Sequence, residues 1–220
     1  MGIFMDCRTL ERREWIVNNY NVVPVAHVKL LAGQSKYSDA GKTINDKYYI
    51  FHAYPLLGGE KEIIQCGMGA ARHLLDLIRH EGLPLYNPLH EEGGAGEPGG
   101  GQRGAGGRRP REIWNPIAKQ LYNAIMWVII IIDAEPDTAI FEIREKVYEY
   151  KYKAPFDSQV KGVNTIIERK LRGRTLTEAI DELKADNNIR GNMCQFDQLI
   201  EIINNYTDRD GNHIEIEPLF

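Results

Sequence analysis

The sequence predicts an α+β fold: a small antiparallel sheet with one or two helices, followed by a mostly helical C-terminal half. β-Branched and aromatic residues, which favour strands, concentrate between residues 22 and 66. From residue 115 onward, apolar residues recur every three or four positions, which is the spacing of a helix face. A chain of 220 residues can bury such a core without a disulfide or a structural metal.

A glycine-rich segment separates the two patterns. Residues 93–107 contain nine glycines in fifteen positions, and too few apolar side chains to offset the entropy lost on ordering. We therefore expect a small α+β domain over residues 1–92, a flexible glycine-rich loop or linker over 93–110, and a helical domain with a short C-terminal strand over 111–220. Whether the glycine-rich segment joins two domains or forms a surface loop of one domain stays open.

The first predicted elements are a helix and a strand. Thr9 can accept a hydrogen bond from the first turn of a helix that ends near Tyr20. Residues 22–31 are rich in valine and suit a strand, with Pro24, a residue that sheets tolerate at their edges, near its start. The polar composition of residues 33–46 predicts a loop.

A hairpin and a second helix complete the first part of the chain. Residues 47–54 are rich in aromatic side chains, and residues 62–66 form the returning strand after a turn with two glycines at 57–60. The next glycines lead into a helix over residues 70–80, because apolar residues recur there at helical spacing until Gly82 ends the pattern.

The second part opens with a helix whose start can be predicted from two residues. Asn115 provides an N-cap, and Pro116 suits the first helical position because its missing N–H would have no partner there. The β-branched run at residues 128–132 is also consistent with a buried strand. We favour a helix, because the helical spacing upstream continues into this run.

The remaining C-terminal sequence predicts four more helices and a short strand. Thr175 and Glu178 form a capping-box pair, in which each side chain satisfies the backbone of the other. A turn at Asp210 and Gly211 precedes a strand over residues 213–217. The predicted helices cover residues 140–150, 160–171, 175–185 and 196–203.

Charge is segregated along the chain. The net charge is −4 and the pI is about 5.9, which disfavours a globally basic nucleic-acid binder. However, residues 144–174 contain nine bases and four acids, whereas residues 175–220 contain three bases and ten acids. Tyr148, Tyr150 and Tyr152 interleave with the bases. Such a mixture suits phosphate contact and base stacking.

From this segregation we predict a non-enzymatic binding or regulatory protein that contacts a polyanion, such as nucleic acid, or a protein partner. No cofactor is expected. The alternative is that the basic stretch and the acidic C-terminal stretch pair with each other. The predicted contact residues are Lys146, Lys151, Lys153, Arg169, Lys170, Arg172 and Arg174.

A second candidate anion site lies where the predicted hairpin leads into the helix at residue 70. Gly67 and Gly69 allow a ligand to approach the backbone closely, and free N–H groups at a helix start attract anions. Arg72 would add a positive charge to this turn. The alternative is a tight strand-to-helix connection with no ligand.

One short motif suggests a nuclease. Asp137 follows Pro136, and Glu149 stands two residues before Lys151. This pattern resembles the motif of the PD-(D/E)XK nuclease superfamily. The resemblance implies that Asp137 and Glu149 hold Mg²⁺ while Lys151 assists the attacking water. That superfamily places both acids on adjacent strands, whereas a helix here would separate them by about 18 Å. A Mg²⁺-dependent nuclease is the alternative function.

The cysteines and the apolar runs predict a cytoplasmic protein without a membrane segment. Cys7, Cys66 and Cys194 are widely spaced and form no CxxC pair, so neither a disulfide framework nor a zinc ribbon is expected. Free thiols are typical of reducing compartments. The most apolar run, residues 124–132, is far shorter than the roughly 20 residues that a membrane-spanning helix needs.

Overall fold

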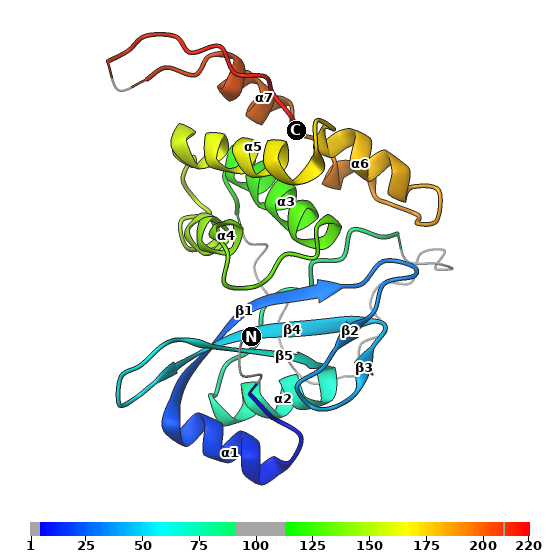
Figure 1. The fold of residues 1–220 in the computed structure, drawn as a ribbon, viewed down its shortest axis with the longest axis vertical. Coiled ribbons are helices and arrows are strands. Elements are labelled where there is room, and N and C mark those ends of the chain that lie inside the picture. Colours follow the sequence, from blue (N-terminus) through cyan, green and yellow to red (C-terminus); the bar gives the residue numbers. More distant parts are fainter. Residues whose placement is uncertain (1–4, 91–112, 209) are drawn as a thin grey trace. The chain divides into compact units, whose positions relative to one another are not determined.

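The computed structural model describes residues 5–90, 113–208 and 210–220 (Figure 1). These residues form an α+β fold, with a small antiparallel sheet and a helix at the N-terminus and a mostly helical C-terminal half, so the predicted fold class is confirmed. The contacts divide the chain into two compact units. The first contains Met1–Pro88 and Asp133–Glu145, and the second contains Leu89–Ile132 and Lys146–Phe220. The whole of the predicted glycine-rich loop, 93–110, lies outside the described residues, and the predicted domain boundaries stay a prediction.

The first unit is built on an antiparallel sheet of three strands in the order β1-β4-β5. The strands are β1 (Tyr20–Lys29), β4 (Lys47–Pro55) and β5 (Glu62–Gly67). The predicted hairpin is therefore confirmed. The register of β1 shifts between Pro24 and Ala26, as expected for a proline that cannot donate to the ladder of an edge strand.

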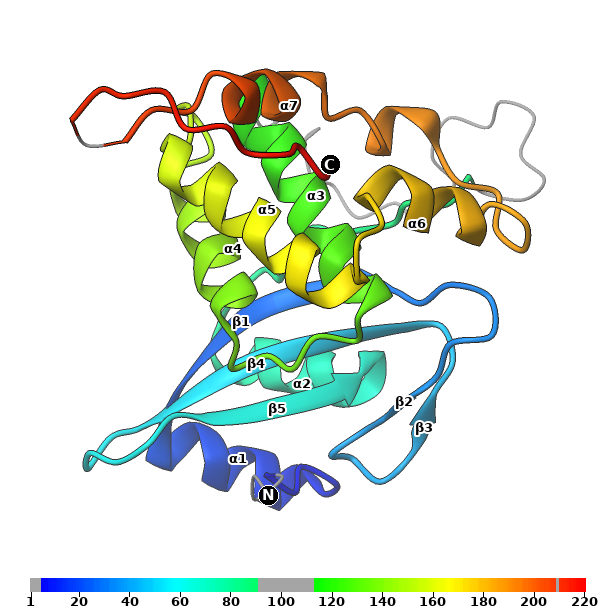
Figure 2. The ribbon, with the colours of Figure 1, turned by 45° about the horizontal axis from the view of Figure 1, so that its top comes forward.

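Two helices cover one face of this sheet. They are α1 (Leu10–Asn19) and α2 (Met68–Leu77), and both lie on the same side of the strands (Figures 1 and 2). Thr9 caps α1 as predicted, because its side chain accepts a hydrogen bond from the N–H of Arg12 at 3.2 Å. The core between the helices and the sheet is fully buried and includes Ile16, Phe51, Ile64, Cys66, Ala71 and Leu74.

The opposite face of β4 is covered by the segment at residues 133–145, which includes the start of α4 (Ala139–Glu149). His52 on β4 is 2% exposed, and its Nδ1 lies 3.1 Å from Glu145 Oε1. Its Nε2 lies 3.3 Å from the carbonyl oxygen of Pro136. Burial lowers the pKa of His52, with Lys61 contributing, so the neutral imidazole is favoured. These polar contacts attach a segment from the second half of the chain to the sheet.

The polar loop predicted for residues 33–46 is more ordered than expected. It contains a second small sheet of β2 (Lys36–Tyr37) and β3 (Thr43–Ile44), which pair antiparallel. Strands of two residues are too short to produce a pattern of alternating burial, so the sequence does not reveal them.

The second unit surrounds one buried helix, α3 (Pro116–Ile131). Every residue from Leu121 to Ile130 is buried, as expected for a helix that is apolar on all sides. The predicted cap is confirmed: the side chain of Asn115 accepts hydrogen bonds from the N–H groups of Ile117 and Ala118. The run at 128–132 therefore continues the helix rather than forming a strand. The helices packed against α3 are α5 (Asp157–Leu171), α6 (Leu176–Leu183) and α7 (Asp197–Asn204) (Figure 2).

The capping box at the start of α6 is also confirmed. The N–H of Thr175 donates to Glu178 Oε2 at 2.7 Å, and the N–H of Glu178 donates to Thr175 Oγ1 at 3.1 Å. This motif was predictable because all of its hydrogen bonds lie within four consecutive residues.

The strand predicted for residues 213–217 is wrong. Only an isolated bridge between Thr207 and His213 forms there, and residues 214–220 belong to neither a helix nor a strand. A side chain holds this segment: Asn164 of α5 donates to the carbonyl oxygen of Glu217 at 2.9 Å and accepts from the N–H of Leu219 at 2.8 Å. The backbone partner is thus an asparagine side chain rather than a neighbouring strand.

Within the described ranges, no helix is both long and apolar enough to cross a membrane.

We expect Asn164→Ala to lower the free energy of unfolding by about 2–4 kcal/mol, because it leaves two backbone groups of the C-terminal segment without partners. Urea denaturation measures this change. Asn204→Ala, at an exposed position at the end of α7, is the matched control and should change stability by less than about 0.5 kcal/mol. Equal effects of the two substitutions would contradict the role of Asn164.

Candidate functional site

Most of the basic side chains predicted to contact a partner are exposed. Lys146, Lys153, Arg169, Lys170 and Arg172 are exposed, and none of them forms an ion pair within the part of the chain that the structure describes. Arg174 differs, because its Nη1 lies 2.5 Å from Glu182 Oε2. The alternative of pairing with the acidic stretch therefore applies to Arg174, while the other five charges face solvent.

The five exposed cations form two groups along the sequence, one before α5 and one at its C-terminal end. Lys146 lies in the last turn of α4, and Lys153 precedes α5. The other three are at the C-terminal end of α5, where cations also interact favourably with the helix dipole. The 15 residues of α5 put about 22 Å between Lys153 and the second group. One small anion cannot contact both groups, whereas a polymer of phosphates can.

Lys151 is placed differently from its neighbours in sequence. It is 8% exposed, and its Nζ lies 4.5 Å from the ring centre of Tyr148 and 5.9 Å from that of Trp114. Lys119 Nζ also lies over this cluster, 4.7 Å from the centre of the Trp114 ring. Cation–π contacts of this kind stabilise a desolvated ammonium group. Lys151 is therefore part of the packing of the second unit rather than of its exposed surface. Of Tyr148, Tyr150 and Tyr152, only the last two are exposed.

The residues of the nuclease-like motif lie apart. Asp137 precedes α4, and its carboxylate lies 2.8 Å from Lys61 Nζ. Glu149 is the last residue of α4, so 11 helical residues, or about 16 Å, lie between the two acids. The structure places a helix where the nuclease superfamily has strands. Among the described residues, no group of three or more histidine, cysteine, aspartate or glutamate side chains could hold a metal ion.

A pocket of about 530 Å³ lies at the N-terminus of α2, at the predicted glycine turn. Gly67 is the N-cap and provides no side-chain hydrogen bond, so the first N–H groups of the helix lack a cap. Gly69 also lines the pocket, whereas Arg72 is exposed on α2 and does not. The basic side chains that line it instead are Arg8, Arg13, Lys42 and Lys47.

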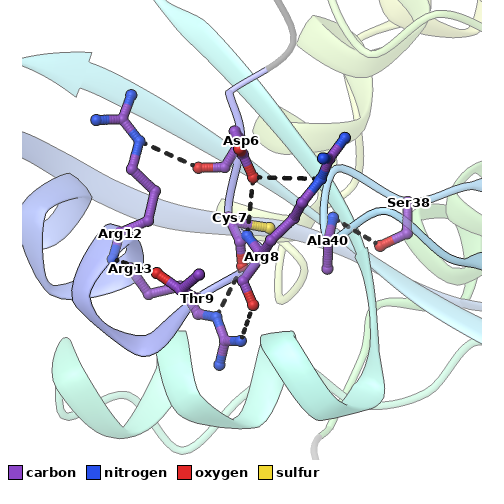
Figure 3. A network of polar contacts seen from close by, with 8 residues as sticks. All are labelled: Asp6, Cys7, Arg8, Thr9, Arg12, Arg13, Ser38 and Ala40. Carbon is purple, nitrogen blue, oxygen red and sulfur yellow. Dashed lines mark hydrogen bonds and ion pairs between the residues drawn. The ribbon is translucent and has the colours of Figure 1, made fainter.

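Backbone carbonyls hold Arg13 in this pocket, and a carboxylate lies beside Arg8 (Figure 3). Arg13 donates to the carbonyl oxygens of Cys7 at 2.8 Å and of Arg8 at 2.9 Å. Arg8 Nε lies 3.7 Å from Asp6 Oδ1. Gly41 has φ 77°, a backbone conformation that favours glycine, and a Cβ there would lie 2.9 Å from Arg8 Nε, which the flexible arginine side chain can relieve by shifting. The sequence does not reveal this lining, because the four basic residues come from three separate segments.

A buried carboxyl group lies next to this segment. Asp39 is 6% exposed, its Oδ2 accepts a hydrogen bond from the N–H of Gln65 at 2.6 Å, and its carbonyl oxygen accepts one from the N–H of Cys7 at 3.1 Å. Its Oδ1 has no hydrogen-bond partner among the described residues. Burial raises the pKa of Asp39 to about 6, despite the opposing hydrogen bond from Gln65.

These features define an α+β protein of two compact units that carries exposed cations before one helix, at its C-terminal end and around one pocket. The family model described as "Uncharacterised conserved protein UCP028583" matches residues 6–207, and the chain belongs to this family. No curated protein and no solved structure matches the chain.

We expect Asp39 to make stability depend on pH. Its folded pKa of about 6 lies above its ordinary value of 3.8, so the folded state binds the proton more tightly, and stability falls as pH rises from about 4 to about 6. Asp39→Asn removes this titration and keeps an oxygen for Gln65. Its free energy of unfolding relative to the wild type should therefore rise by about 2–3 kcal/mol between pH 4 and pH 7.5 in urea denaturation.

Asp46→Asn is the control for this measurement. The ion pair with Lys29 lowers the pKa of Asp46, so the relative stability of this variant should fall, not rise, over the same pH range. Parallel pH profiles of the two variants would contradict the assignment for Asp39.

We expect Gly69→Asp to raise the free energy of unfolding by about 1 kcal/mol. No atom lies within 4 Å of a Cβ built at this position, and the substitution replaces a glycine within a helix. A carboxylate there also lies near the uncapped N–H groups of α2 and the basic side chains that line the pocket. Gly69→Lys is the matched control with the opposite charge and should be less stable than Gly69→Asp at low salt. If both variants were equally stable at low and high salt, the positive potential of the pocket would be refuted.

Proposed function

We propose that this protein is a non-enzymatic, cytoplasmic binding protein that contacts a polyanion, namely nucleic acid. The observation that carries the proposal is the set of five exposed cations before α5 and at its C-terminal end, which have no ion pairs in the described part of the chain. Positive side chains with this arrangement gain binding free energy by displacing the counterions of a phosphate backbone.

The spacing of the cations supports a polymer as the ligand. Lys153 and the second group are about 22 Å apart, which corresponds to several nucleotides of one strand. Tyr150 and Tyr152 are 55% and 64% exposed and lie beside Lys153 in the sequence, so they offer rings for base stacking. A protein partner with an acidic surface would use the same charges but would gain nothing from stacking.

The pocket at the start of α2 is a second place where the proposed protein would favour an anion. Four basic side chains line it. Its one acidic lining residue, Asp46, pairs with Lys29 and lies 3.8 Å from Lys47, and Asp6 lies 3.7 Å from Arg8, so the bases outnumber the acids around it. Phosphate groups suit such a site, since they accept several hydrogen bonds from arginine, lysine and free backbone N–H groups.

We expect the triple variant Arg169→Gln, Lys170→Gln and Arg172→Gln to bind a fluorescent single-stranded 20-mer DNA at least about tenfold more weakly than the wild type. Fluorescence anisotropy at several salt concentrations measures this. The slope of log K against log salt should fall by about 2, since each lost phosphate contact contributes about 0.7 on a single strand.

A second triple variant keeps the overall change of charge and provides the control. Arg12→Gln, Arg79→Gln and Lys184→Gln lie outside the proposed surface and should change affinity less than about twofold. Equal losses in both triple variants would show general attraction rather than a surface. Absence of DNA binding by the wild type at low salt would overturn the nucleic-acid proposal and leave an acidic protein as the partner to test.

A further inference from the structure

Exposed aromatic side chains concentrate in the connection between α4 and α5. Six aromatic side chains are exposed in the part of the chain that the structure describes, and three of them lie within seven residues here: Tyr150, Tyr152 and Phe156. Phe156 is 77% exposed, although it belongs to neither the basic nor the tyrosine pattern of the sequence. Seven residues span at most about 21 Å. One ligand can therefore contact all three rings, and clustered exposed apolar side chains are typical of interaction sites.

The backbone of this connection is attached to two neighbouring helices. The carbonyl oxygen of Lys151 accepts a hydrogen bond from the N–H of Asn115, the N-cap of α3, at 2.8 Å. The N–H of Phe156 donates to Oε1 of Gln159, in the first turn of α5, at 2.9 Å. Because these contacts already restrict the segment, it loses little conformational freedom when a ligand binds, which favours affinity.

The buried Lys151 also holds one of the three rings. Its Nζ lies over the ring of Tyr152, 5.6 Å from the ring centre, and over that of Tyr148 at 4.5 Å. Lys151 is buried while Tyr152 is mostly exposed, so the ammonium group contacts Tyr152 from the protein side. A cation–π contact at this distance restrains the ring and leaves the rest of its surface open to a ligand.

The charges around the rings nearly balance. Within residues 146–157, Lys146, Lys151 and Lys153 outnumber Glu149 and Asp157 by one. Asp157 lies in the first turn of α5, where the helix dipole stabilises a carboxylate. Charge alone therefore gives this connection little affinity for phosphates, and a ligand that binds here gains mainly from contact with the rings.

We propose that the connection between α4 and α5 is a stacking site for the bases of single-stranded nucleic acid, with Tyr150, Tyr152 and Phe156 as the stacking residues. This inference rests on the proposed function and specifies its ligand. A duplex keeps the faces of its bases inside the helix, whereas a single strand presents them to side chains. The exposed cations at the C-terminal end of α5 are then available for the phosphates of the same strand. An acidic protein offers few flat faces of this kind and would gain little from three rings.

The experiment compares three fluorescent ligands by anisotropy: a thymidine 20-mer, an abasic 20-mer with the same number of phosphates, and a 20-bp duplex. The wild type should bind the thymidine strand at least about tenfold more tightly than the abasic strand. The combined variant Tyr150→Leu, Tyr152→Leu and Phe156→Leu should bind the thymidine strand at least about tenfold more weakly than the wild type, and the other two ligands within about twofold. Its slope of log K against log salt should equal that of the wild type, because no phosphate contact is lost.

A second variant and a second measurement provide the controls. Trp15→Leu with Tyr37→Leu removes two exposed aromatic rings of the first unit and should change affinity for the thymidine strand by less than about twofold. Ultraviolet crosslinking of the wild type to a 20-mer that contains 5-bromodeoxyuridine should modify tryptic peptides within residues 147–161. This measurement locates the contact without any substitution, so it holds even if the combined variant folds poorly.

Equal affinities of the wild type for the thymidine strand and the abasic strand would overturn the stacking site and leave the polyanion proposal intact. Crosslinks confined to other peptides would do the same. If the wild type bound none of the three ligands at low salt, both the proposed function and this inference would be wrong.

Discussion

The first unit depends on the burial of β4 on both of its faces. Side chains of a strand alternate between the two faces, so Tyr49, Phe51 and Ala53 face α1 and α2, while His52 faces the other way. A central strand with both faces buried needs two covering layers. The second layer comes from residues 133–145. In this segment Pro136, whose carbonyl oxygen contacts His52, lies 84 positions after His52 in the sequence.

This requirement explains why the cover is polar at its centre. A neutral imidazole has one N–H donor and one acceptor nitrogen. The carbonyl of Pro136 or the carboxylate of Glu145 can accept from the N–H, and the hydroxyl of Tyr54 lies 3.5 Å from Nδ1. The ion pair between Lys61 and Asp137 adds a contact beside them. Apolar packing alone would have left the imidazole without partners, so these polar contacts determine which segment can cover the sheet.

The basic residues of the second unit, which are close together in the sequence, have three different structural roles. Lys151 is desolvated against aromatic rings, Arg174 is neutralised by Glu182, and Lys170 with its exposed neighbours faces solvent. Only the last role is available to a partner. The glycine turn shows the converse: its chemistry comes from Arg8 and Arg13, which the sequence places far from Gly67.

The sequence by itself determined the elements whose partners lie within a few residues. These include the caps at Thr9 and Asn115, the capping box at Thr175, the hairpin of β4 and β5, and the continuous helix α3. Local hydrogen bonds and periodic burial leave a readable pattern, because the interacting residues are close in the chain.

Only the tertiary structure decided the features whose partners are distant. They include the cover of β4, the attachment of the C-terminal segment to Asn164, and the burial of Lys151 beside Trp114. Each depends on two segments that meet only after the chain has folded, and no spacing along the sequence encodes such a meeting. The same residue types occur elsewhere in this chain without forming such contacts, so residue type alone does not predict them.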